Sequence, residues 1–244
     1  MSLILSIETA TEACSVALHT EAQLIATQTL HVAKSHAESL LLTIEHLLAI
    51  SPYEKEELAA VAVSSGPGSY TGLRIGTSTA KGLCYALGIP LIAVNTLEAM
   101  AHGMQPYNTN QALLCPMIDA RRMEVYCLLT DAQGKLLEAA HPQVIDQDSF
   151  QSWLQEQPIL FFGNGAEKCK PLLGAHPHAC FIDHIHPTAQ HIGALAYVKF
   201  QQAAFENSPI ARGLLTQSGG WFSTWKRHYS AMKNGTSRPS KLIA

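Results

Sequence analysis

The sequence predicts an α/β protein of two lobes with a common design, and three observations support that prediction. Residues 3–30 hold three short apolar segments separated by polar turns, which is the pattern of an antiparallel β-meander. Segments with helical and strand spacing alternate after this meander. A fainter copy of the meander starts about 110 residues later, where Ile118-Asp119 echoes Ile7-Glu8. The repeat predicts two meander-plus-helix lobes that face each other across a cleft.

The composition is that of a globular protein that works in the cytoplasm. With 244 residues, 47% of them hydrophobic, the chain can bury a core for one large domain or two lobes. No apolar run approaches the roughly 20 residues of a membrane span, and the N-terminus lacks the features of a signal peptide. We therefore expect no membrane partner. The six cysteines are scattered without a Cys-x-x-Cys pair, so we expect reduced, buried thiols.

Charge divides the chain into an acidic body and a basic tail. Residues 1–205 carry 10 Lys and Arg against 18 Asp and Glu, whereas residues 206–244 carry 6 against one. The tail also contains Trp221 and Trp225, and aromatic side chains among cations can bind nucleic acid. An unrelated or poorly ordered extension would have the same composition. We therefore expect lobes at 1–108 and 109–205 and a tail of uncertain order at 206–244.

The first meander is expected at Leu3–Ile7, Ala13–His19 and Gln23–Leu30. Glu8 ends its first strand, where a carboxylate can order a metal-bound water or hydrogen-bond the following turn. We prefer the turn role, because a single carboxylate does not make a metal site.

A helix is expected after Ser35, since Ser35 and Glu38 have the spacing of a capping box. Its apolar residues lie on more than one side, and Ser51-Pro52 ends it. That excess fits a helix buried between its own sheet and a partner, although a helix covered by its own chain would look similar. His36 and His46 are expected on its polar face.

A glycine-rich turn follows the apolar strand Leu58–Val63 and leads into a second helix. Gly66 and Gly68 permit backbone angles that a Cβ would forbid, and Ser69 or Thr71 could cap the helix, so the turn could hold an anion. Neither the Walker A pattern nor the dinucleotide pattern fits, and a plain strand-to-helix turn remains the simpler interpretation.

Small residues then line one face of this second helix. Gly72, Gly76 and Ala80 are spaced four apart, so another helix could approach closely, from a partner or from the same chain. The predicted partner interface comprises positions on both helices: Leu41, Ile44, Leu48, Gly72, Gly76, Ala80 and Leu83.

Two segments resemble a known family. Gly66–Gly76 is similar to the signature of the bacterial TsaB (YeaZ) family, and Leu3–Leu18 is similar to that family's opening. The resemblance covers residues 1 to about 205 and implies the two-lobed actin-like (ASKHA, RNase H-like) fold of the actin, Hsp70 and sugar-kinase superfamily.

The resemblance also implies a function. TsaB proteins are non-catalytic partners of TsaD in adding threonylcarbamoyl (t6A) to adenosine 37 of tRNAs that read codons starting with A. It implies TsaE as a further partner, tRNA through the complex and a homodimer when the protein is alone. It implies no tightly bound cofactor, with ATP or ADP at the complex interface left open. TsaD binds a metal through two histidines, which correspond to Thr96 and Met100 here, so no metal centre and no catalytic residue is expected.

The residues leave two other functions possible. A self-sufficient ATP-dependent phosphotransferase or glycoprotease-like metallohydrolase would rely on Glu8, Asp119 and Arg74, but no Ser-His-Asp or Cys-His set is recognisable. An RNA-binding module would work through the tail. The weak candidates for nucleotide binding are Glu8, Gly66, Gly68, Ser69, Thr71 and Asp119.

The second half contains one glycine turn and one histidine-rich segment. Gly163-Asn164-Gly165 is expected to be structural, because no Ser, Thr or Lys stands beside it to hold a phosphate. Five histidines and Cys180 fall within residues 176–191, a spacing that could chelate a metal. The prolines among them favour loops at strand ends, and a last helix is expected from Ala189 to Phe205.

Overall fold

The computed structural model describes residues 2–32 and 35–206. Residues 1–205 form one compact unit. The basic tail predicted at 206–244 therefore lies, from residue 207 on, outside the described residues.

The first sheet has five strands in the order β3-β2-β1-β4-β5. Its meander is antiparallel, as predicted, and β4 and β5 run parallel to β1. The strands are β1 (Leu3–Glu8), β2 (Cys14–Thr20), β3 (Gln23–Leu30), β4 (Leu58–Ser64) and β5 (Leu91–Val94).

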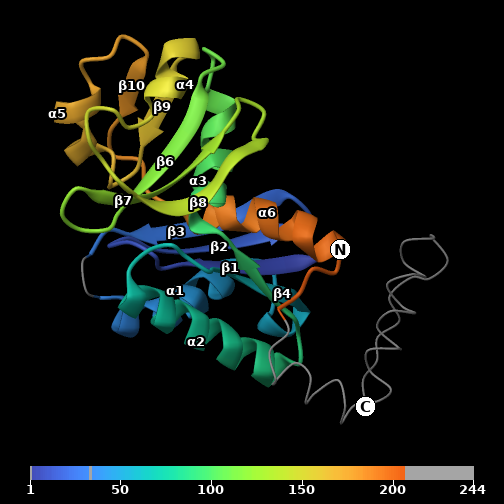
Figure 1. The fold of residues 1–244 in the computed structure, drawn as a ribbon. Coiled ribbons are helices and arrows are strands. Elements are labelled where there is room, and N and C mark those ends of the chain that lie inside the picture. The colour runs from blue at the N-terminus through green and yellow to red at the C-terminus, as the bar shows by residue number, and fades with distance from the viewer. Residues whose placement is uncertain (1, 33–34, 207–244) are drawn as a thin grey trace, which may run out of the picture. The chain divides into compact units, whose positions relative to one another are not determined.

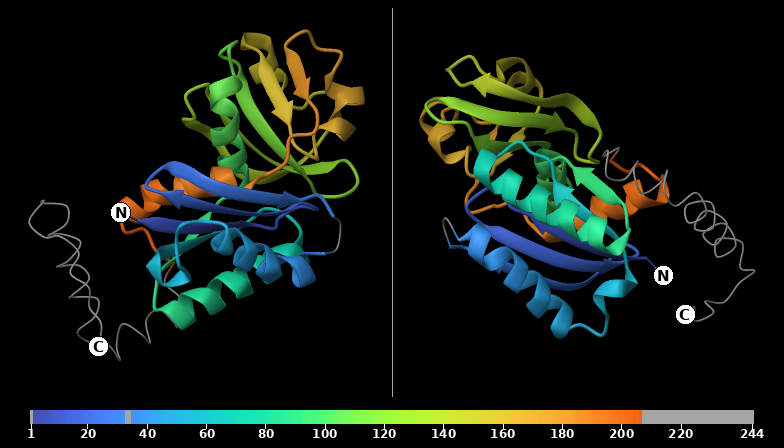
Figure 2. Two further views of the ribbon diagram at one scale, coloured as in Figure 1. Left: turned by 180° about the vertical axis from the view of Figure 1, so that it is seen from behind. Right: turned by 90° about the horizontal axis from the view of Figure 1, so that it is seen from below.

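Two helices cover one face of this sheet, α1 (His36–Ala49) and α2 (Tyr70–Leu87). They lie beside each other on that face (Figures 1 and 2). Alternate strand residues such as Leu5, Val16 and Val63 point toward them and form an apolar core. The helices thus bury one side of the sheet and leave their own outer sides to the surroundings.

The second sheet repeats the first, with the order β10-β9-β6-β7-β8. Its meander is antiparallel and its last two strands run parallel to β6, so each strand has a counterpart in the first sheet. The predicted duplication is confirmed. The strands are β6 (Leu113–Asp119), β7 (Glu124–Thr130), β8 (Leu136–Val144), β9 (Ile159–Phe162) and β10 (Ala179–Ile182).

The second half has two very short helices and one longer helix. They are α4 (Gln151–Glu156), α5 (Lys170–Leu173) and the longer α6 (Ala189–Gln201). Short 3-10 turns occur at Lys55–Glu57, Gln105–Tyr107 and Glu167–Cys169.

Each half of the chain places its last helix on the sheet of the other half. Helix α3 (Thr96–Met104) follows the first sheet but packs on β6 and β7 of the second. Helix α6 follows the second sheet but covers the face of the first that α1 and α2 leave open, and it also contacts α3 (Figure 1). Ala189 N donates to Ser15 Oγ at 3.1 Å and Lys199 Nζ donates to Ala93 O at 2.7 Å. The lobe boundary predicted between residues 108 and 109 thus assigns α3 to the first lobe, although α3 packs on the sheet of the second.

Local signals set the ends of α2 and the start of α3, but not the start of α1. Ser69 Oγ accepts from Gly72 N at the start of α2, Gly88 ends that helix at φ 66°, and Asn95 Oδ1 caps α3. The capping box predicted at Ser35 is wrong, because Ser35 Oγ donates to Val32 O at 2.8 Å instead. His36 is buried rather than on the polar face.

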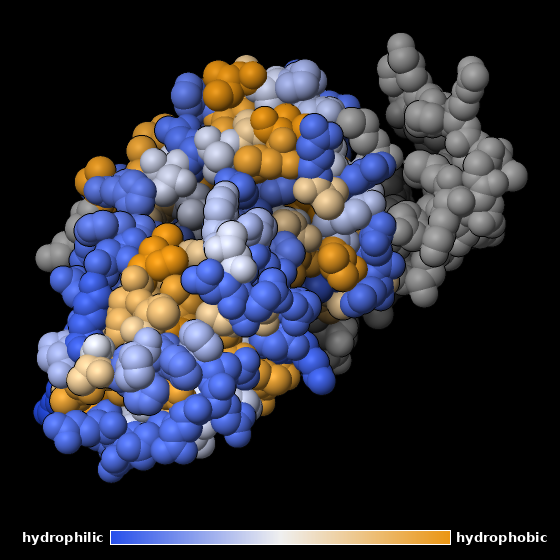
Figure 3. Space-filling view, turned by 90° about the horizontal axis from the view of Figure 1, so that it is seen from above, coloured by the Kyte–Doolittle hydropathy of each residue, from blue (hydrophilic) through white to orange (hydrophobic). Residues whose placement is uncertain are grey.

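Five cysteines are buried and Cys180 is exposed, and all six thiols are free. No helix within residues 2–32 and 35–206 combines the length and apolar character that a membrane crossing requires. Seen from the side opposite α1 and α2, hydrophobic residues lie in separate groups among hydrophilic ones (Figure 3).

Candidate functional site

The glycine turn after β4 packs tightly against the chain that follows β1. A Cβ on Gly68 would lie 2.4 Å from Ala10 O, and Ser69 N donates to that same oxygen at 2.6 Å. Thr9 Oγ1 donates to Gly72 O at 2.9 Å. Contacts within the chain therefore require glycine here, and the nucleotide contact suggested for this turn stays a prediction.

The small-residue stripe of α2 also faces inward. A Cβ on Gly72 would lie 2.1 Å from Thr9 O, and one on Gly76 would lie 2.3 Å from Thr9 Oγ1. Ala80 belongs to the core under the helix. The close neighbour of Gly72 and Gly76 is thus Thr9 in the loop after β1, which corrects the expectation that a second helix approaches these two positions.

The other positions predicted for the interface divide by burial. Ile44 is buried in the core, whereas Leu48 and Leu83 are half-buried against it. Leu41 is 53% exposed on the outer side of α1. Only Leu41, of these four, offers most of its side chain to a partner.

Sequence reasoning missed the outward stripe of α2. Tyr70, Arg74, Lys81 and Tyr85 are exposed and lie on one helix face at spacings of four, seven and four. The Arg74 guanidinium lies 5.2 Å from the centre of the Tyr70 ring. We call the exposed residues Leu41, Leu42, Tyr70, Arg74, Lys81 and Tyr85 the outer face. The sequence contained the information for this prediction, because residues on the side of α2 opposite Gly72 and Gly76 must face outward once those glycines face the core.

Glu8 is fully buried and hydrogen-bonds its own turn, as the sequence favoured. Its Oε1 accepts from Ala10 N at 2.6 Å. Neither Glu8 Oε2 nor Ser64 Oγ makes a well-formed hydrogen bond within the described residues. Burial raises the pKa of Glu8 to about 7, against the opposing effects of the Ala10 amide, the nearby Ser64 hydroxyl and the Thr9 amide. The carboxyl is half-protonated near neutral pH.

Asp119 holds the matching position in the second lobe, but its environment differs. It is exposed and forms an ion pair with Lys168. Asp119 Oδ1 accepts from Arg121 N at 3.0 Å, and Asp119 N donates to Asn164 Oδ1 at 3.1 Å. Asp119 thus organises its own turn, while Arg74 lies over Tyr70. The three residues proposed for a self-sufficient enzyme engage separate partners.

The positions that correspond to the metal ligands of TsaD lie in the interior. Met100 packs in the apolar cluster between α3 and the second sheet, and Thr96 is buried with no hydrogen bond from Oγ1 to any described residue. Among the described residues, no group of three or more His, Cys, Asp or Glu side chains could hold a metal ion.

The histidine-rich segment includes β10, and its imidazoles have separate neighbours. His176 and His178 meet edge to face at 5.6 Å, while His178 Nδ1 lies 2.7 Å from Leu154 O. His186 packs edge to face on His31 and His191 Nδ1 lies near Thr188 Oγ1.

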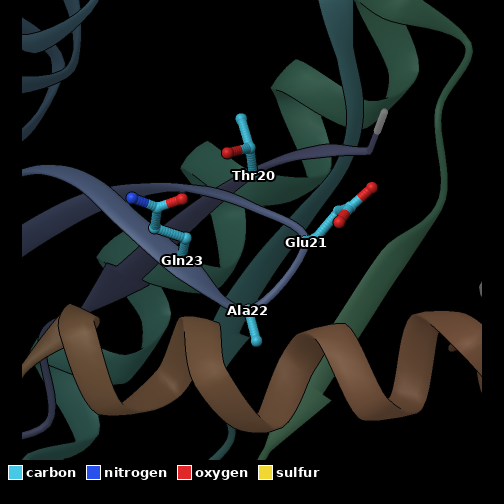
Figure 4. Close-up of a pocket in the computed structure, with 4 residues that line it drawn as sticks. All are labelled: Thr20, Glu21, Ala22 and Gln23. Carbon is cyan, nitrogen blue, oxygen red and sulfur yellow. The ribbon is translucent and has the colours of Figure 1, made fainter.

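A shallow pocket lies at the turn between β2 and β3, lined by Thr20, Glu21, Ala22 and Gln23. Ala22 points toward α6 (Figure 4). This pocket is distinct in sequence from the glycine turn and contains one ionisable side chain, that of Glu21.

Comparison with known proteins identifies the family. The family profile described as TsaD, tRNA N6-adenosine threonylcarbamoyltransferase, matches residues 22–210, more than half of the chain. A Bacillus subtilis protein named tRNA threonylcarbamoyladenosine biosynthesis protein TsaB is 33% identical over 176 residues, 70% of this chain and 74% of the relative. The chain belongs to the TsaB (YeaZ) family. The Escherichia coli protein of the same name is 41% identical over 123 residues, about half of each chain.

Solved structures agree with this assignment. YeaZ from Pseudomonas aeruginosa superposes with a TM-score of 0.71 at 26% identity, covering 84% of this chain and 95% of the other. The activator of 2-hydroxyisocaproyl-CoA dehydratase from Clostridium difficile reaches 0.50 at 11% identity, covering 84% and 99%. This TsaB-family chain therefore has the expected two-lobed actin-like fold.

His19 and His102, which sequence reasoning missed, and His191 lie where α3, α6 and the first sheet of this TsaB-family protein meet. A Cβ on Gly193 of α6 would lie 2.1 Å from His19 Nδ1, and one on Gly103 of α3 would lie 2.4 Å from the His191 ring. Burial lowers the pKa of His19 to about 4, with the Gln190 backbone opposing and His191 adding to the shift. Burial also lowers the pKa values of His102 and His191.

We expect acid to destabilise the protein through His19. Its pKa is about 4 when folded and about 6.5 when unfolded, so the unfolded state binds the proton more tightly. The stability from neutral His19 is complete above about pH 6.5 and declines by at most about 3 kcal/mol as the pH falls to 4. In urea unfolding between pH 7 and 4.5, His19→Gln should lose less stability than the parent protein, and His46→Gln should match the parent. Equal losses in all three would contradict the assignment.

Proposed function

We propose that this chain acts in threonylcarbamoyl modification of adenosine 37 in tRNA, as the non-catalytic partner of a TsaD protein. Family membership carries the proposal, since relatives that are 33% and 35% identical over 176 and 127 aligned residues are named for tRNA threonylcarbamoyladenosine biosynthesis. The separate partners of Glu8, Asp119 and Arg74 support a non-catalytic role. They count against a stand-alone phosphotransferase or metallohydrolase.

The outer face is the proposed contact with TsaD. Helices α1 and α2 lie side by side, and both expose large apolar or aromatic side chains, among them Leu41, Tyr70 and Tyr85. Aromatic residues and arginine are enriched at the centres of protein interfaces, and the outer face contains both, since Arg74 lies beside the two tyrosines. The same face would serve a homodimer when TsaD is absent.

The remaining partners follow from the complex. TsaE and tRNA join this chain and TsaD, and the assembly works in the cytoplasm. No cofactor is bound tightly by this chain alone, and any ATP or ADP is held at the interface of the complex.

The substitution Leu41→Asp tests the outer face. It places a charge at the centre of the proposed apolar contact, and we expect it to weaken TsaD binding by roughly 30-fold or more, equivalent to about 2 kcal/mol. Since Leu41 is exposed, the melting temperature should stay nearly unchanged. Calorimetric titration with TsaD and mass spectrometry of the modified tRNA measure both effects.

The matched control is Val144→Asp, at an apolar residue of β8 that is 65% exposed. It should bind TsaD like the parent protein. TsaD affinity retained by Leu41→Asp would exclude the outer face, whereas a parent chain that neither binds TsaD nor supports tRNA modification would refute the proposed function itself.

A further inference from the structure

The turn between β6 and β7 holds two consecutive arginines in an unusual backbone conformation. Arg121 has φ 69° and Arg122 has φ 43°, both in the left-handed region. For residues with a Cβ this conformation costs about 1 kcal/mol or more each, and it persists only where the surroundings enforce it. We call Arg121 and Arg122 with their backbone the arginine turn.

Lys168 supplies that enforcement. Its ammonium donates to Arg122 O at 2.8 Å and to Glu124 O at 2.7 Å, with a longer contact to Arg121 O at 3.3 Å. It also pairs with Asp119. The Lys168 ammonium thus contacts four oxygens around the turn and holds its backbone in place. Its charge is paired with Asp119.

The two guanidinium groups, in contrast, are unengaged. Both arginines are exposed, and their side chains have no hydrogen bond or ion pair with any described residue. A strained backbone and the partly buried Lys168 thus hold two cationic side chains that pair with no described residue. Such an arrangement is typical of a binding element.

The position of the turn supports the same conclusion. The arginine turn follows the carboxyl end of β6, beside the turn that follows β9, and open α/β sheets bind their ligands at the carboxyl ends of parallel strands. The equivalent turn after β1, residues 9–13, follows the buried Glu8 and contains no cation. The second lobe thus presents two free positive charges in a body that is otherwise acidic, with 10 Lys and Arg against 18 Asp and Glu in residues 1–205.

We propose that the arginine turn contacts the phosphate backbone of RNA, with Arg121 and Arg122 as the contacting residues and Lys168 as a positioning residue. A guanidinium matches phosphate oxygens with two parallel hydrogen bonds, and neighbouring guanidiniums suit a polymer of phosphates. The identity of that RNA as tRNA rests on the proposed function. The contact deepens that function by giving this chain its own hold on the substrate.

The test is a titration of tRNA over a range of NaCl concentrations, with the full chain alone and with its TsaD complex. The double variant Arg121→Gln with Arg122→Gln should bind tRNA about tenfold more weakly near 0.15 M salt, and its log–log salt slope should fall by about 2. The control Lys55→Gln with Lys135→Gln removes the same charge from exposed sites elsewhere and should change neither quantity.

Three results would overturn the proposal. They are an unchanged affinity and slope in the double variant, an equal loss in the lysine control, and a loss of TsaD affinity in place of tRNA affinity. The outcome is separable from the proposed function, because TsaD binding that is normal in the double variant leaves that function standing whatever the tRNA titration shows.

Discussion

Gly72→Ala is expected to lower the melting temperature by roughly 2–12 °C, because its new Cβ would meet a backbone atom. The Cβ would lie 2.1 Å from the carbonyl oxygen of Thr9, and the loop or the helix must move to relieve this overlap. Overpacking of this kind costs about 1–3 kcal/mol, and each kcal/mol shifts the melting temperature of a protein of this size by about 2–4 °C. Thermal unfolding followed by circular dichroism measures the change.

Two further substitutions in the same region make the prediction specific. Gly76→Ala meets Thr9 Oγ1 at 2.3 Å, so Thr9→Ala should rescue it, whereas Gly72→Ala should not be rescued because its obstacle is backbone. Gly82→Ala is the control, since its Cβ would meet nothing within 4 Å, and alanine favours a helix over glycine by about 1 kcal/mol. Normal stability with lost TsaD affinity in Gly72→Ala would instead make the stripe a partner contact.

Glu8→Gln is expected to stabilise the protein at pH 8 by up to about 3 kcal/mol and by much less at pH 5. The pKa of Glu8 is about 7 when folded and 4.5 in its ordinary state, so the fold favours the protonated carboxyl. Its contribution is therefore fully present below pH 4.5 and is lost as the pH rises to 7. Glutamine is uncharged and keeps an oxygen for the Ala10 amide.

Urea unfolding at both pH values measures the gain, with Glu156→Gln as an exposed control. A gain that is independent of pH would show that Glu8 is not protonated in the fold. The same variant tests the alternative function. Glu8→Gln should support tRNA modification as well as the parent does, and a folded variant without that activity would favour a catalytic carboxylate.

The fold was predictable because its signals are local and repeated. Apolar segments separated by polar turns marked the meander, glycines marked the turn after Leu58–Val63, and the echo of Ile7-Glu8 in Ile118-Asp119 marked the second lobe. The exchange of α3 and α6 was not predictable, since the spacing of apolar residues in a helix shows which face is buried and not which sheet buries it.

The candidate site was predicted less well, for a related reason. The spacing of Gly72 and Gly76 correctly indicated a close approach, but the approaching group is Thr9, which lies in a loop without periodicity. Ser35 had the residue type of a cap and a competing acceptor in Val32. The arginine turn depends on Lys168, 46 residues after Arg122, and only the folded structure brings them together.

The exchange of the last helices has a consequence for synthesis on the ribosome. Helix α6 ends at Gln201 and covers the face of the first sheet opposite α1 and α2. That face therefore stays uncovered until nearly the whole of residues 1–205 has been synthesised. An apolar face waiting that long would invite aggregation of the nascent chain. This face instead carries Ser6, Ser15 and His19 among its residues, and water can solvate them until the helix arrives. We therefore expect Ser6, Ser15 and His19, whose burial costs free energy in the folded protein, to reduce aggregation of the nascent chain before α6 is synthesised.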